Sequence, residues 1–108
     1  MDKIKYFDGH NDVLLKLFYS KSKDPTEDFF NGNNYCHIDY KKVKISNFIG
    51  GFFAIFVPDK EPQFNFFSRM ESESYDFPLP DEIPYEKAIN ATEKMIDIIS
   101  FLKNMVKL

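Results

Sequence analysis

The stretch GGFFAIFVP, residues 50–58, constrains the fold of this 108-residue chain more than any other segment. It is a nearly continuous apolar run, bounded by glycines on one side and by Pro58 on the other. A strand with one face in water alternates apolar and polar residues, and this run does not alternate. We therefore expect a strand that is buried on both faces, as in a parallel sheet covered by helices.

The first 50 residues contain one further strand and one helix that the pattern defines. Residues 3–8 alternate and then turn apolar, which predicts a short strand. Helical spacing begins after Asp12, a residue type favoured at helix N-caps. Residues 20–34 are polar and contain Pro and Gly, which predicts a loop, and residues 37–50 are too mixed to assign. The helical apolar positions are Val13, Leu14, Leu17 and Phe18.

The second half of the chain predicts a long loop followed by a long helix. Residues 59–84 contain four of the six prolines, which favours a loop. Proline suits the first position of a helix, so we expect the helix to begin at Pro84. Its apolar residues share one face: Ala88, Ala91, Met95, Ile98, Ile99, Leu102, Met105 and Val106.

These elements give a βα unit twice, which predicts an α/β fold with parallel strands. Two strands are too few for a stable sheet, and the apolar strand would leave an open edge. The sequence ends after a helix, where a third strand would be expected. We therefore expect residues 1–108 to be a single, partial domain.

Composition excludes several classes of function. The net charge of −3 is mild, and no basic block suggests a nucleic-acid surface. No apolar run approaches the roughly 18 residues of a membrane span, and the N-terminus lacks a signal-peptide pattern. Cys36 is the only cysteine, which rules out an internal disulfide and suits a reducing compartment. We expect a cytoplasmic protein in which Cys36 is a small buried residue.

A candidate metal site lies in KYFDGHNDVL, residues 5–14. Side chains two apart on a strand project to the same face, so His10 and Asp12 would reach one point, with Asp8 on the same side. Imidazole nitrogen and carboxylate oxygen are good ligands for Zn²⁺ and related metals. The alternative is that the His-x-Asp pattern arose by chance and that Asp12 only caps the helix.

A second His-x-Asp pattern, His37–Asp39, stands in a different context. It follows the polar segment NGNNYC and leads into a lysine-rich run. We expect His37 to fix a loop rather than to bind a metal.

Several segments together resemble a known family. FDGHNDVLLKL, HIDYKKVKISNFIGGFFAIFVP and YDFPLP, followed by AINATEKMIDIISFL, resemble in order the N-terminal part of the membrane dipeptidase (renal dipeptidase) family. GGFFAIFVP and YDFPLP look more like its soluble bacterial members. The resemblance covers nearly the whole chain, which corresponds to roughly the first third of a family member.

The resemblance implies that the chain forms the N-terminal βα units of a (β/α)₈ TIM-like barrel. It also implies a proteolytic function, since members of this family are metallopeptidases that use two zinc ions to hydrolyse dipeptides. Such enzymes tolerate a D-residue at the C-terminal position of the substrate. His10 and Asp12 match the two first-strand ligands, both on one zinc. The bridging glutamate, the ligands of the second zinc, the substrate-binding residues and the acid/base aspartate all match positions beyond this segment. It therefore carries no catalytic residue and no identified substrate-binding residue.

The expected function is accordingly zinc-dependent dipeptide hydrolysis, with the chain inactive by itself because half of one metal site is present. One alternative is a short non-catalytic module of the same ancestry, whose open strand edges are covered by self-association. Another is a metal-dependent amidohydrolase acting on other amides, although such enzymes more often carry His-x-His where this chain has Asp12.

Overall fold

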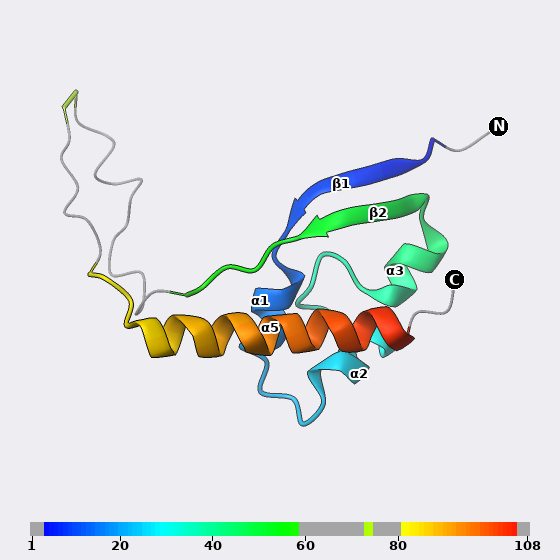
Figure 1. The fold of residues 1–108 in the computed structure, drawn as a ribbon. Helices are drawn as coiled ribbons and strands as arrows, with labels where there is room; N and C mark the ends of the chain where they lie inside the picture. Colours follow the sequence, from blue (N-terminus) through cyan, green and yellow to red (C-terminus); the bar gives the residue numbers. More distant parts are fainter. Residues whose placement is uncertain (1–3, 59–72, 75–80, 106–108) are drawn as a thin grey trace.

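The structure is a computed structural model that describes residues 4–58, 73–74 and 81–105. Within these ranges the chain forms two strands and four helices (Figure 1). In chain order they are β1 (Tyr6–Asn11), α1 (Val13–Phe18), α2 (Pro25–Asn31), α3 (Tyr40–Ile45), β2 (Phe48–Phe53) and α5 (Tyr85–Met105).

The two strands lie side by side and are parallel, as the sequence predicts. Tyr6 is opposite Phe48, and their rings make an edge-to-face contact with centroids 5.7 Å apart. The register then shifts by one residue, so that Phe7 lies opposite Gly50. The connection between the strands runs through α1, α2 and α3, which is the crossover that parallel pairing requires.

The expectation that the apolar run is buried on both faces is wrong for the described chain. The strand is Phe48–Phe53 rather than residues 50–58, and Ile49 and Phe52 are 63% and 67% exposed. Phe53 packs against the core, whereas the Phe52 ring contacts only one described aromatic ring, that of Phe7, at 5.1 Å. No residue of either strand is fully buried, so the described helices leave much of this two-stranded sheet uncovered.

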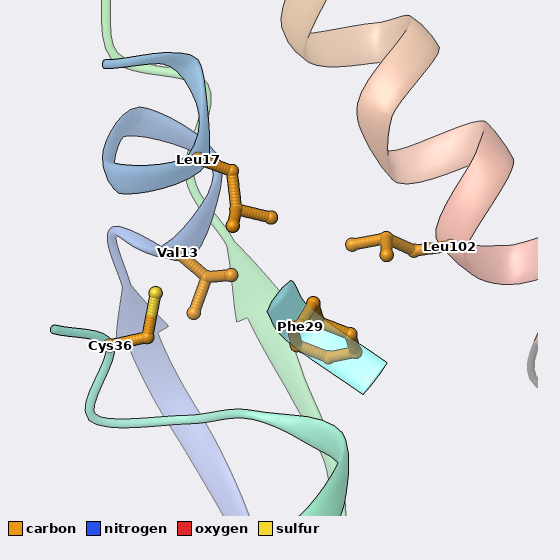
Figure 2. Close-up of a cluster of buried hydrophobic side chains, with 5 residues drawn as sticks. All are labelled: Val13, Leu17, Phe29, Cys36 and Leu102. Carbon is orange, nitrogen blue, oxygen red and sulfur yellow. The ribbon is translucent and has the colours of Figure 1, made fainter. Parts of the chain in front are cut away.

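The core lies where α1, α2 and α5 meet (Figures 1 and 2). α1 and α2 both pack against α5. Cys36 is buried, as expected, at 2% exposure. Full burial of an aliphatic or aromatic side chain contributes about 1.5–3 kcal/mol, so this cluster helps to tie α5, through Leu102, to the first half of the chain. Its buried members are Val13, Leu17, Phe29, Cys36 and Leu102.

The predicted long helix is confirmed as α5. It begins at Tyr85, and the carbonyl of Pro84 accepts a hydrogen bond from the Ala88 amide at 3.0 Å. Of its predicted apolar face, Ala91, Met95 and Leu102 are buried and Met105 is exposed. Ile98 is partly buried and packs against the cluster that contains Leu102. Val106 and most of the predicted loop 59–84 lie outside the described residues. None of the described helices combines the length and apolar character needed to cross a membrane.

The expectation of a loop over residues 20–34 is wrong, because α2 lies within it. The Asp24 carboxylate caps this helix, accepting from the Glu27 amide at 3.2 Å and from the Thr26 hydroxyl at 2.6 Å. Pro25 follows at the first helical position, where its missing amide hydrogen costs nothing. An Asp-Pro pair opening an acidic turn is a helix-start signal that outweighs the general polarity of this segment.

Asp39 caps α3 from a buried position. Its carboxylate accepts from the Lys42 amide at 2.9 Å and from the Asn33 amide at 3.3 Å, and it lies 3.0 Å from Lys42 Nζ. Burial alone would raise the pKa of Asp39, but these hydrogen bonds and the Lys42 charge outweigh it and lower the pKa. The stability that this shift provides is present above the ordinary aspartate pKa of about 3.9 and is lost as pH falls through the folded-state pKa.

We predict that Asp39→Ala lowers the free energy of unfolding by about 2 kcal/mol, because the backbone amides of Asn33 and Lys42 lose their acceptor and α3 loses its cap. The matched control is Asp24→Ala, which removes an exposed cap of the same residue type and should cost clearly less. Denaturant unfolding of both variants at neutral pH measures the difference. Equal losses would show that burial of Asp39 adds nothing to its capping role.

Candidate metal and ligand site

A pocket of about 360 Å³ lies beside β1 and the start of α1. Three segments form its wall: β1 with the residues that follow it, the residues just before α3, and the beginning of β2. The lining residues are Tyr6, Asp8, His10, Asn11, Asp12, Val13, Lys16, His37, Ile38 and Phe48.

His10 and Asp12 converge at this pocket. His10 belongs to β1, Asp12 lies between β1 and α1, and His10 Nε2 is 3.2 Å from Asp12 Oδ1. Both side chains are accessible, with 67% and 49% of their surfaces exposed. The side-by-side placement expected from the His-x-Asp spacing is therefore what the structure has, and the metal role of the pair stays a prediction.

Asp12 occupies the N-cap position of α1, but its side chain does not cap the helix. Asn11 does so instead, since its Oδ1 accepts a hydrogen bond from the Val13 amide at 3.3 Å. Only the backbone carbonyl of Asp12 serves the helix, by accepting from the Lys16 amide at 3.1 Å. The interpretation of Asp12 as merely a helix cap is thus not supported, and its carboxylate can engage His10 or a cation.

Asn11 also fixes Asp8. Its Nδ2 donates to Asp8 Oδ2 at 3.0 Å, so one oxygen of this carboxylate is engaged within the strand. Gly51 lies opposite Asp8, and a Cβ atom at Gly51 would lie only 3.1 Å from Asp8 Cβ, so a larger residue there would crowd Asp8. Asp8 therefore lines the pocket but is less available to a ligand than Asp12.

The donor set fits part of a zinc site. One imidazole nitrogen and one carboxylate oxygen are typical zinc donors, and a closed site needs about four. Among the described residues no group of three or more His, Cys, Asp or Glu side chains is close enough to hold a metal. His10 and Asp12 thus fit as two ligands of a site that needs others.

His37 lies at the same pocket, which the sequence did not indicate. It was expected to fix a loop, but the loop is held by Asn33, Asp39 and Lys42, and no described residue forms a hydrogen bond with the His37 ring. Its position depends on how the segment before α3 folds back toward β1, and no local pattern carries that information.

Two comparisons find similar proteins. No family model matches the chain. A curated protein of Acinetobacter calcoaceticus, described as an uncharacterised protein in the PQQ-III 3′ region, is 46% identical over 55 residues, or 51% of this chain and 18% of the relative. The description of this relative gives no activity.

The solved structures that match are metallopeptidases. Dipeptidase AC, a metallopeptidase of family M19, matches 95% of this chain with a TM-score of 0.74 and 32% identity. A metallopeptidase from Rhodobacter sphaeroides, solved with a phosphinate mimic of the dipeptide L-Ala-D-Ala, matches 95% with a TM-score of 0.74 and 33% identity. These neighbours support the resemblance to dipeptidases and the α/β fold.

The chain spans a small part of each relative. It covers 28% of the length of dipeptidase AC, 30% of the Rhodobacter sphaeroides chain and 18% of the Acinetobacter protein. The match therefore describes a dipeptidase-like segment.

We predict that Asn11→Ala and Asp12→Ala have different effects on stability. Asn11→Ala should cost about 1 kcal/mol, because α1 loses its side-chain cap and Asp8 loses a partner. Asp12→Ala should stay within about 0.5 kcal/mol of the wild type, because that side chain caps nothing. Thermal or denaturant unfolding checks both, and the reverse order would restore Asp12 as a purely structural cap.

Proposed function

We propose that this chain corresponds to the N-terminal part of a zinc-dependent dipeptidase and forms the first βα units of a (β/α)₈ barrel. The observation that carries the proposal is the 3.2 Å approach of His10 Nε2 to Asp12 Oδ1 at the end of β1. It is supported by the match of 95% of the chain to metallopeptidase structures at 32–33% identity. The single cysteine suits a cytoplasmic location, which we also propose.

In this proposal His10 and Asp12 are two ligands of one zinc ion. A bound zinc supplies an activated water near neutral pH and polarises a scissile carbonyl. Two side chains of this segment would bind the metal. His10 would offer Nε2, and Asp12 would offer a carboxylate that makes no capping hydrogen bond. The side chain of Asn11 bonds the first helical amide instead. The proposed substrates are dipeptides, including those with a C-terminal D-residue such as L-Ala-D-Ala.

The remaining ligands and the acid/base group of the complete site are proposed to come from outside these residues. Two ligands leave most of the coordination of a zinc ion to water and give weak affinity. The 108-residue chain by itself is therefore proposed to be inactive.

A second candidate is a non-catalytic module that associates with itself. It is favoured by apolar side chains that the described chain leaves in water. Phe7, Ile49 and Phe52 of the sheet, and Phe56 after β2, are all more than half exposed. Sedimentation of the isolated chain distinguishes the two, since a folded monomer would argue against the module.

We predict that the isolated chain with Zn²⁺ does not cleave L-Ala-D-Ala above background, whereas a longer protein that contains it does. In that longer protein His10→Ala should abolish cleavage and remove bound zinc, because zinc loses one of its ligands. His37→Ala is the control and should leave the zinc content near normal. Amine release and metal analysis measure both. Zinc loss in His37→Ala with retention in His10→Ala would mean that the other His-x-Asp pattern holds the metal.

A further inference from the structure

In the second His-x-Asp motif, the fold explains the role of Asp39 but not that of His37. Asp39 is buried and caps α3, which accounts for the aspartate. His37 is exposed and lines the same pocket as His10 and Asp12. Its ring accepts or donates no hydrogen bond within the described part of the chain, so packing and hydrogen bonding leave its presence there unexplained.

The segment that carries His37 is held firmly from both sides. Asn33 Oδ1 accepts from the Tyr35 amide at 3.1 Å and from the Cys36 amide at 2.7 Å. Lys42 Nζ donates to the Cys36 carbonyl at 2.6 Å, which fixes the backbone next to His37.

A further contact ties this segment to the helix that follows Asp12. Lys16 Nζ donates to the Tyr35 carbonyl at 2.7 Å. The pair His10–Asp12 and the residue His37 are therefore held on one framework, although Asp12 and His37 are 25 positions apart in the chain. Because the backbone that carries His37 is already fixed, less conformational entropy is lost when a ligand binds the side chain.

The side chains of the pocket suit a small ligand that carries both hydrogen-bond donors and acceptors. An imidazole ring has one donor and one acceptor nitrogen when neutral, so it can bond either a carbonyl or an N–H group. Small-molecule pockets use a few such groups to fix orientation among apolar walls, here those of Tyr6, Ile38 and Phe48. His37 belongs to no metal-sized cluster among the described residues, which argues against a role as a third ligand.

We propose that His37 contacts the ligand of this pocket, forming a hydrogen bond from its ring to a dipeptide while His10 and Asp12 hold the metal. The choice of a dipeptide rests on the proposed function, which this inference deepens by naming a substrate-contacting residue. His37 is then a binding residue, and Asn33 and Lys42 position it through the backbone.

The test uses the 108-residue chain, whose only two histidines are His10 and His37, so that their ring signals in an NMR spectrum separate the two roles. Excess Zn²⁺ is added first and L-Ala-D-Ala second, with a parallel titration of the dipeptide without zinc. Zinc should shift the His10 ring signals most, and the dipeptide should shift those of His37. His37→Asn should weaken dipeptide binding about three- to tenfold, the value of one hydrogen bond.

The control is Asn34→Ala, which changes an exposed residue of the same segment that does not line the pocket. It should bind the dipeptide as the wild type does. His37 signals that stay unmoved by the dipeptide, or unchanged binding in His37→Asn, would overturn the inference and leave the zinc assignment intact. A His10 ring that ignores zinc while His37 responds to the dipeptide would instead refute the metal site and support the His37 contact.

Discussion

Backbone pairing between β1 and β2 holds Tyr6 opposite Phe48 and Asn11 opposite Phe53, and it determines where β1 ends. At that end the chain must turn at once into α1, whose Val13 and Leu17 enter the core. The turn leaves His10 and Asp12 side by side at the rim of the pocket. The candidate site therefore depends on a strand that is fixed by its neighbour and a helix that is fixed by the core.

The capping of α1 shows how a neighbouring residue can preserve a functional one. Aspartate at an N-cap position usually accepts a hydrogen bond from the first helical turn. Here Asn11 takes that role, so the Asp12 carboxylate approaches His10 instead. In the second His-x-Asp motif the aspartate does cap its helix, from a buried position. The two motifs thus contain the same residue types, but Asp12 contacts the histidine of its motif whereas Asp39 caps a helix.

Much of the local structure followed from the sequence, because periodicity and caps are local signals. The α5 helix, the parallel pairing and the burial of Cys36 were predicted correctly from such signals. The α2 helix was missed because residues 20–34 are mostly polar, although Asp24 and Pro25 are a helix-start signal. The exposure of Phe52 and the placement of His37 beside His10 depend on contacts between distant segments, which no window of sequence contains. The barrel stays a prediction that the described residues do not test.

The central claim is that His10 and Asp12 coordinate one cation together. X-ray absorption at the zinc edge of the zinc-loaded chain tests it most directly, because a coordinated imidazole gives a distinctive scattering pattern. The account predicts a single imidazole nitrogen at about 2.0–2.1 Å with oxygen donors completing the shell, and loss of the imidazole signal in His10→Ala. A zinc environment with no imidazole, or one that His10→Ala leaves unchanged, would contradict it.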